Sequence, residues 1–380
     1  MIYLDNSATT RPFDDTLEAM AHAAREGYFN PSSLYAQAME GGRLLSGAKS
    51  AVQGALGAAD GTVVFTSGGT ESDNLAILGA AANLRGKRGH FLYGAAEHPA
   101  VAQAMEALRG AAHDVQVIPV DSSGAVSPGV LRGMLREDTA LVSVQHVNNE
   151  VGAVNPIEEL AALVHEVNPR ALFHTDAVQA FLRVPVRARE IDLYSLSAHK
   201  FHGPRGIGAL WMSRRAKLMP IVHGGGQQNG LRSGTENTPG AAGMRAAIDT
   251  MRSISGLSDA LMQKKLCLHR LIMEAVPDAR VNGPDPLEGA PHILNMSFGL
   301  RGEILLHALE GEGILVSTGS ACSSRRKKPS DTLTAMGCSP ETIEGALRFS
   351  LSPMNTMEEM EMTAEALGRL VPQYRRYRRK

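Results

Sequence analysis

Short apolar runs alternate with longer amphipathic stretches between about residues 45 and 250. The apolar runs predict strands at 62–66, 90–94, 115–120, 140–147, 171–175, 193–196 and 208–212. The stretches at 71–84 and 99–109 predict helices between the strands. Strands that alternate with helices are joined by right-handed crossovers. The pattern therefore predicts a large α/β domain, with a mostly parallel sheet covered on both faces.

The pattern changes after Pro239. A long helical stretch at 241–275 carries apolar residues at mixed spacings of three and four, and it could connect two domains. Beyond it, the sequence predicts strands at 292–298 and 314–317 and a helix at 301–311, and Ser339 can cap a further helix. We therefore expect an N-terminal arm (1–15), a large domain (16–250) and a smaller α+β domain (251–380).

Composition narrows the class of protein. The 380 residues suffice for two or three domains, and 38 Lys plus Arg against 39 Asp plus Glu give a formal net charge of −1. This balance argues against direct binding of nucleic acid or an anionic membrane. Three cysteines are too few for a disulfide framework, no apolar run is long enough to span a membrane, and the first residues lack the pattern of a signal peptide. We expect a cytoplasmic protein.

The segment 66–72 contains a possible phosphate cradle. Its glycines, Gly69 among them, would let the backbone approach an anion, and the start of the following helix offers unpaired amide hydrogens. Ser67 and Thr70 add hydroxyl donors. Taken alone, an ordinary glycine-rich turn between a strand and a helix explains the segment equally well.

Two charged residues follow predicted strands. Asp176 ends an apolar strand, where ligands of open α/β sheets bind, and its carboxylate could stabilise a protonated ring nitrogen, hold a metal or merely cap a helix. Lys200 lies between small, hydroxyl and imidazole side chains, with Ser197 and His199 nearby. Such a lysine can form a Schiff base, although most lysines simply lie at the surface.

Cys322 is the strongest candidate nucleophile. It lies among small residues after a predicted strand, and the positive field of the neighbouring segment 325–328 favours the thiolate. Cys267, in a helical stretch, and Cys338, just before a helix, are expected to be inert. No Cys-x-x-Cys or His-Glu-x-x-His motif appears, so no metal site is predicted.

Two further residues have alternative interpretations. His98 opens a helix after a strand, so it is either a capping or solvated side chain or a proton shuttle in a cleft. Arg348 alternates with Leu347 and Phe349 and projects from the opposite face of its strand. It could bind a substrate carboxylate, or it could be an ordinary solvent-facing residue.

A phosphate cradle, an acidic partner for a ring nitrogen and a Schiff-base lysine together match the needs of pyridoxal 5′-phosphate (PLP). The sequence closely resembles the cysteine desulfurases of the NifS/IscS type, within the class V aminotransferase family. The resemblance covers essentially the whole chain and rests on the motifs around Asp176 and Lys200 and on residues 3–10, 30–33, 67–74, 147–152, 224–228 and 232–237. It implies a fold-type I PLP-dependent transferase, with a large domain containing a mostly parallel mixed sheet and a smaller α+β domain.

The resemblance also implies residue roles. Lys200 would hold PLP and shuttle protons, Asp176 would pair with the ring nitrogen, and Cys322 would be the nucleophile. The remaining cofactor contacts would come from His98 stacking on the ring, Gln179 at the ring hydroxyl, and Gly69, Thr70, Ser197, His199 and a partner subunit's Thr235 at the phosphate. The substrate would be bound by Asn149, which also lies near the ring, and by Arg348 and Asn30.

The implied partners are a second copy of the chain in a homodimer, L-cysteine as substrate, and a sulfur acceptor for iron–sulfur assembly or tRNA thiolation. The four consecutive positive charges at 325–328 depart from the family pattern. They suggest an acceptor with an acidic surface or one that works on tRNA, a hypothesis that unchanged sulfur transfer after their neutralisation would contradict. An ordinary aminotransferase, a selenocysteine lyase and a catalytically silent assembly partner are the alternatives.

Overall fold

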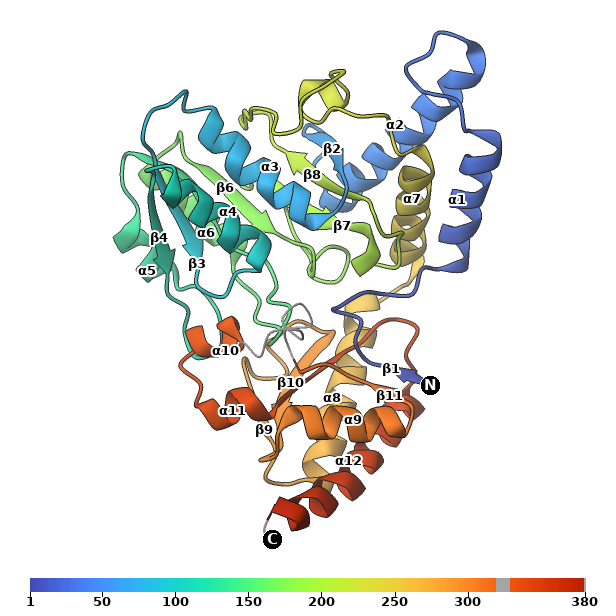
Figure 1. Ribbon diagram of the computed structural model, residues 1–380, viewed down its shortest axis with the longest axis vertical. Helices are drawn as coiled ribbons and strands as arrows, with labels where there is room; N and C mark the ends of the chain where they lie inside the picture. The colour runs from blue at the N-terminus through green and yellow to red at the C-terminus, as the bar shows by residue number, and fades with distance from the viewer. Residues whose placement is uncertain (319–328, 379–380) are drawn as a thin grey trace.

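The computed structural model describes residues 1–318 and 329–378 (Figure 1). Its largest sheet has the strand order β2-β8-β7-β6-β5-β3-β4 in this part of the chain. The strands are β2 (Thr62–Thr66), β3 (His90–Gly94), β4 (Asp114–Ile118), β5 (Thr139–Ser143), β6 (Leu172–Asp176), β7 (Leu193–Ser197) and β8 (Gly208–Met212). β8 runs in the opposite direction to all the other strands of this sheet, which are parallel to one another. The predicted mostly parallel mixed sheet is confirmed.

Helices cover both faces of this sheet. The side chains along each strand point alternately to the two faces, and so into two separate hydrophobic cores. Val64 and Leu210 point into a core with α3 (Gly69–Ala82) and α4 (Pro99–Gly110). Val63 and Trp211 point into the opposite core. That second core contains residues of α2 (Ala36–Leu56), α6 (Ile157–Val167) and α7 (Thr238–Ser253), and α1 (Asp14–Glu26) packs against α7. A short helix, α5 (Pro128–Met134), lies beside α6.

The C-terminal part is built around a smaller antiparallel sheet, shown in the lower half of Figure 1. Its strands are β9 (Arg280–Val281), β10 (Ile293–Ser297) and β12 (Ala346–Ser350). The accompanying helices are α8 (Leu257–Ala275), α9 (Gly302–Gly311), α10 (Asp331–Ala335), α11 (Pro340–Gly345) and α12 (Met357–Arg378). None of the helices in the described ranges has the length and apolar character needed to traverse a membrane.

The first residues of the chain pack against the C-terminal part. β1 (Ile2–Tyr3) pairs in parallel with β11 (Ile314–Leu315). Residues 4–10 then run along the junction between the two parts, where the backbone of Thr10 bonds to that of His199. The N-terminal arm is therefore in contact with both parts of the molecule.

The structure corrects one expectation and excludes one of the two alternatives for Arg348. The stretch 241–275 is not one helix: α7 ends at Ser253 and α8 begins at Leu257, with Gly256 between them at φ 62°. This left-handed conformation favours glycine and redirects the chain, so that α7 packs against α1 and α2 whereas α8 packs against α12. Arg348 is not solvent-facing either. It is only 1% exposed, because residues of the N-terminal arm and of the segment after β5 cover that face of β12.

Candidate active site

The predicted site residues converge because the strands that carry them are parallel. β2, β3, β5, β6 and β7 all point the same way, so the segments after them lie at one edge of the sheet. Gly208, which starts β8 at the same edge, permits tight packing there. A Cβ atom at this position would lie 2.6 Å from the Leu196 carbonyl oxygen and 2.7 Å from the Gly68 Cα.

The N-terminus of α3 lies at this edge and can hold an anion. A Cβ atom on Gly69 would lie 2.7 Å from Val178 Cγ2 and 3.6 Å from Ser197 Cβ, so the segments after β6 and β7 pack directly against the first turn. Thr70 is exposed on that turn. The amide hydrogens of the helix start, its positive dipole and the hydroxyls of Thr70 and Ser197 are together suited to phosphate.

Asp176 ends β6 as a buried carboxylate whose Oδ1 accepts a hydrogen bond from the Val178 backbone N–H at 2.9 Å. Burial first, and then the nearby Asp73, raise its pKa to about 6. Burial also raises the pKa of Asp73 to about 7 and that of Glu97 well above its usual range. A buried acid with a raised pKa ionises readily once a cationic group lies against it.

Lys200 follows β7 in a short 3-10 turn, η1 (Ala198–Lys200), and its side chain reaches the N-terminal arm. Its Nζ donates hydrogen bonds to the carbonyl oxygens of Ser7 at 2.6 Å and Ala8 at 2.9 Å. Gln179 Nε2 donates to the same Ser7 oxygen at 2.9 Å. The Gln179 Oε1 atom is buried and lacks a hydrogen-bond partner among the described residues, so it can accept from a ligand hydroxyl.

His98 caps α4, one of the roles considered for it. Its Nδ1 accepts a hydrogen bond from the Ala100 backbone N–H at 3.1 Å, so the neutral ring carries its proton on Nε2. Burial and Lys200 lower its pKa, whereas Asp176 raises it. These electrostatic effects mean that the imidazole lies near both groups. With Thr70 it also lines a hollow of about 380 Å³ at the start of α4.

Arg348 extends from β12 toward the N-terminal arm. Its Nη2 lies 2.6 Å from Asp5 Oδ1, and its Nη1 donates to the Asn149 carbonyl oxygen at 2.9 Å. His199 also contacts the arm, since its Nδ1 lies 3.1 Å from Thr9 Oγ1. Lys200, Gln179, His199 and Arg348 are therefore all held by residues 5–9.

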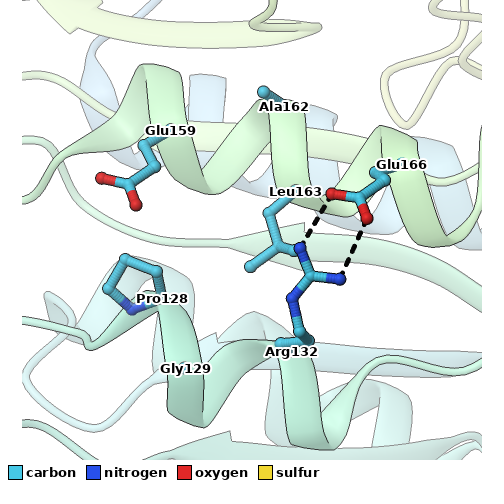
Figure 2. A pocket seen from close by; sticks show the side chains of 7 residues that line it. All are labelled: Pro128, Gly129, Arg132, Glu159, Ala162, Leu163 and Glu166. Atoms are coloured by element: carbon cyan, nitrogen blue, oxygen red, sulfur yellow. Dashed lines mark hydrogen bonds and ion pairs between the residues drawn. The ribbon is translucent and has the colours of Figure 1, made fainter.

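Two predicted residues lie apart from this cluster. Asn30 is exposed in the connection between α1 and α2, and its Oδ1 accepts only a local bond from the Ser32 N–H. Thr235 is exposed in the connection before α7. A second hollow, of about 330 Å³, lies between α5 and α6 (Figure 2). Arg132 and Glu166 form an ion pair across it, and it contains none of the predicted site residues.

Cys322 and the basic segment 325–328 lie outside the described residues. The residues that flank them are tied to the site. The backbones of Ser317 and Arg348 bond to each other at 2.7 and 3.2 Å. On the other side, Ser330 Oγ donates to Glu150 Oε2 at 2.6 Å, next to Asn149.

Sequence analysis missed Asp5, Asp73 and Glu97 as members of the site. The sequence did contain a signal for the burial of Asp73, because this residue shares one face of α3 with the apolar residues Ala76, Ile77 and Ala80. Its carboxylate lies 3.5 Å from Nε2 of the buried His174. Within the described residues, no group of three or more His, Cys, Asp or Glu side chains is arranged to bind a metal ion.

Comparisons with known proteins place the whole chain among relatives of one family. The model of the aminotransferase class-V family matches residues 2–362. A cysteine desulfurase IscS of Methanosarcina thermophila is 39% identical, over 98% of this chain and 93% of its own. The solved structure of a NifS-like protein superposes with a TM-score of 0.90 at 34% identity, over 98% of this chain and 99% of that one. The solved structure of SspA in complex with cysteine has a TM-score of 0.82 at 31% identity, over 94% of this chain and 100% of that one.

Fold and site thus define a PLP-dependent enzyme, and the chain belongs to the aminotransferase class-V family. Within that family it groups with the cysteine desulfurases of the IscS and NifS type.

The residues present fit PLP. The N-terminus of α3 with Ser197 suits a phosphate, the buried Asp176 carboxylate suits a cationic ring nitrogen, and the unpartnered Gln179 Oε1 suits a ring hydroxyl. Lys200 supplies the amine. Each group is a donor, acceptor or charge of the kind that the cofactor requires.

Asp176→Asn is expected to lower kcat for L-cysteine by about 10²-fold or more, because a neutral amide loses the charge that stabilises a cationic ring nitrogen. The fold should persist, since the amide oxygen can still accept the Val178 N–H. Steady-state kinetics and a thermal melt of the same preparation measure the two effects. A kcat within about twofold of wild type would contradict the role of Asp176.

Proposed function

We propose that the protein is a cysteine desulfurase that converts L-cysteine to L-alanine and holds the sulfur as a persulfide on Cys322. The observation that carries this proposal is that residues 5–8 hold both the Lys200 amine and the Arg348 guanidinium, with Lys200 at the edge of the large sheet where Asp176 ends β6. The names of its relatives, cysteine desulfurase and SspA in complex with cysteine, support the choice of substrate.

The cofactor supplies an electron sink for negative charge that develops at the substrate α-carbon. Asp176 would maintain the positive charge of the ring nitrogen, and the α3 N-terminus with Thr70, Ser197 and His199 would bind the phosphate. Lys200 Nζ would take the α-proton and return a proton during turnover. Arg348 and Asn149 would bind the substrate carboxylate and so orient the α-carbon toward Lys200.

Sulfur transfer would be carried out by Cys322. Its thiolate would attack the sulfur atom of the substrate, forming an S–S bond while the C–S bond breaks. The electron pair of the broken bond would pass to the substrate β-carbon, which takes up a proton and becomes the methyl group of alanine. The sum is one thiol and one L-cysteine giving one persulfide and one L-alanine, so no outside oxidant is needed.

The direct test is an assay of the purified, PLP-loaded protein with L-cysteine and a thiol reductant. We expect alanine and sulfide in equal amounts. Formation of 3-mercaptopyruvate from L-cysteine and an added 2-oxo acid, without sulfide, would indicate an ordinary aminotransferase. Turnover of L-selenocysteine with none of L-cysteine would indicate a selenocysteine lyase.

We also propose, from the family resemblance, a cytoplasmic homodimer that passes its sulfur to an iron–sulfur scaffold or a tRNA-thiolation enzyme. In such a dimer Thr235, and Asn30 as a substrate contact, would complete the partner's site, in keeping with their exposure in the single chain. Analytical ultracentrifugation measures whether the chain is a dimer. Transfer of labelled sulfur from the loaded enzyme to an iron–sulfur scaffold and to a tRNA-thiolation enzyme measures which acceptor it serves, and no transfer to either would contradict the proposed acceptors.

A further inference from the structure

We propose that Asp5 is a positioning residue for substrate binding: its carboxylate holds the Arg348 guanidinium in the orientation that receives the substrate's carboxylate. Substrate affinity would then depend on an N-terminal residue that need not touch the substrate. The inference rests on the proposed role of Arg348 and assigns a function to the arm that the desulfurase reaction itself does not require.

The first support is the geometry of the guanidinium. Arg348 Nη2 lies 2.6 Å from Asp5 Oδ1, and Nη1 donates to the Asn149 carbonyl oxygen at 2.9 Å. The arginine side chain is 2% exposed, whereas that of Asp5 is 20% exposed. A charged pair this close and this buried fixes the plane of the guanidinium, which is what a bidentate contact to a carboxylate needs.

The second support is the rigidity of Asp5 itself. Its backbone is bridged to Ser350 on the same strand as Arg348, and the flanking Leu4 and Asn6 bond to Ser350 at 2.7 and 3.2 Å. Tyr3 Oη donates to the carbonyl oxygens of Asp5 at 3.0 Å and Thr9 at 2.8 Å. Because these bonds hold the backbone, the carboxylate is a fixed support and not a mobile competitor for the guanidinium.

The third support is that the same short segment holds the amine. Ser7 and Ala8, two and three residues after Asp5, accept the hydrogen bonds of Lys200 Nζ. An amino-acid substrate carries its amino group and its carboxylate on a single carbon, so the separation of Lys200 and Arg348 must match that spacing. Residues 5–8 connect the two cationic groups and act as a spacer between them.

The charges around Arg348 are consistent with this role. Its other acidic neighbour is the buried Glu150, whose carboxylate is bonded to Ser330 and whose pKa is raised by burial. Asp5 is thus the carboxylate in direct contact with the guanidinium among the described residues. Removal of Asp5 takes away both a hydrogen-bond acceptor and a counter-charge.

The test uses the PLP-loaded full-length enzyme with Asp5→Ala and Asp5→Asn. We expect Asp5→Ala to raise KM for L-cysteine and the inhibition constant of L-alanine about 10- to 100-fold, with kcat and cofactor absorbance much less affected. Asp5→Asn, which keeps an acceptor oxygen, should give a smaller increase. Ethylamine, which is alanine without its carboxylate, should bind equally to all variants. Asp14→Ala, an exposed aspartate paired with Arg11, is the matched control.

A double-mutant cycle separates positioning from general damage. In an Arg348→Ala background, Asp5→Ala should leave the inhibition constant of L-alanine unchanged, because the guanidinium that Asp5 positions is gone. Additive losses, or equal losses for ethylamine, would overturn the proposal, as would an Arg348→Ala variant that binds L-alanine normally. A wild-type enzyme that binds L-alanine through Arg348 but releases no sulfide would refute the desulfurase proposal and leave the positioning role intact.

Discussion

Replacing Lys200 with alanine is expected to lower kcat for L-cysteine by at least about 10³-fold. The amine is the group closest to the chemistry that we propose, and it is held by the Ser7 and Ala8 carbonyl oxygens. Alanine supplies neither an attachment point for PLP nor a base for the α-proton. The visible absorbance of the lysine-bound cofactor should disappear together with the activity.

The control for this experiment is Lys264→Ala. Lys264 lies on α8 and donates to the Pro353 carbonyl oxygen at 3.1 Å, outside the site. The expected result is normal absorbance and normal turnover. If Lys200→Ala retained the absorbance of the bound cofactor, Lys200 would not be the residue that holds it.

Cys322→Ser should abolish sulfide release, by about 10³-fold or more, while the absorbance of the bound cofactor survives. A serine hydroxyl remains protonated at neutral pH and cannot displace carbon from sulfur, whereas a thiolate can. Alanine and sulfide formation, measured beside the absorbance spectrum, separates loss of the nucleophile from loss of the cofactor site. Cys267→Ser and Cys338→Ser are the matched controls and should turn over normally. Full turnover by Cys322→Ser would refute the persulfide route.

The large sheet is predictable from sequence because most of its strands are short apolar runs buried on both faces, although β4 alternates buried and more exposed residues. The predicted runs 62–66, 90–94 and 208–212 coincide with β2, β3 and β8. The helix at 241–275 is wrong because the 3.6-residue apolar pattern continues across Ser255-Gly256, a dipeptide of the kind that marks turns. Beyond this turn α8 packs on α12, a contact between distant segments.

The site residues also divide into those that local sequence patterns can place and those that only contacts between distant segments reveal. The convergence of Asp176 and Lys200 follows from parallel strands that share an edge, so the positions of these residues can be inferred from local patterns. The partnership of Asp5 with Arg348 cannot, because it joins residues 343 positions apart. The burial of Asp73 is equally hidden, since an aspartate on a helix usually faces solvent. Only the packing of α3 on the sheet reveals that it is buried.

The span from Asp5 to Arg348 has a consequence for biosynthesis. In a chain that grows from its N-terminus, residues 2–8 cannot make these contacts until β11 and β12 have been synthesised. Until then the arm that holds Lys200 and Arg348 has no strand to pair with. A nascent chain that ends before β12 therefore lacks both Arg348 and the strand that fixes the arm beside Lys200.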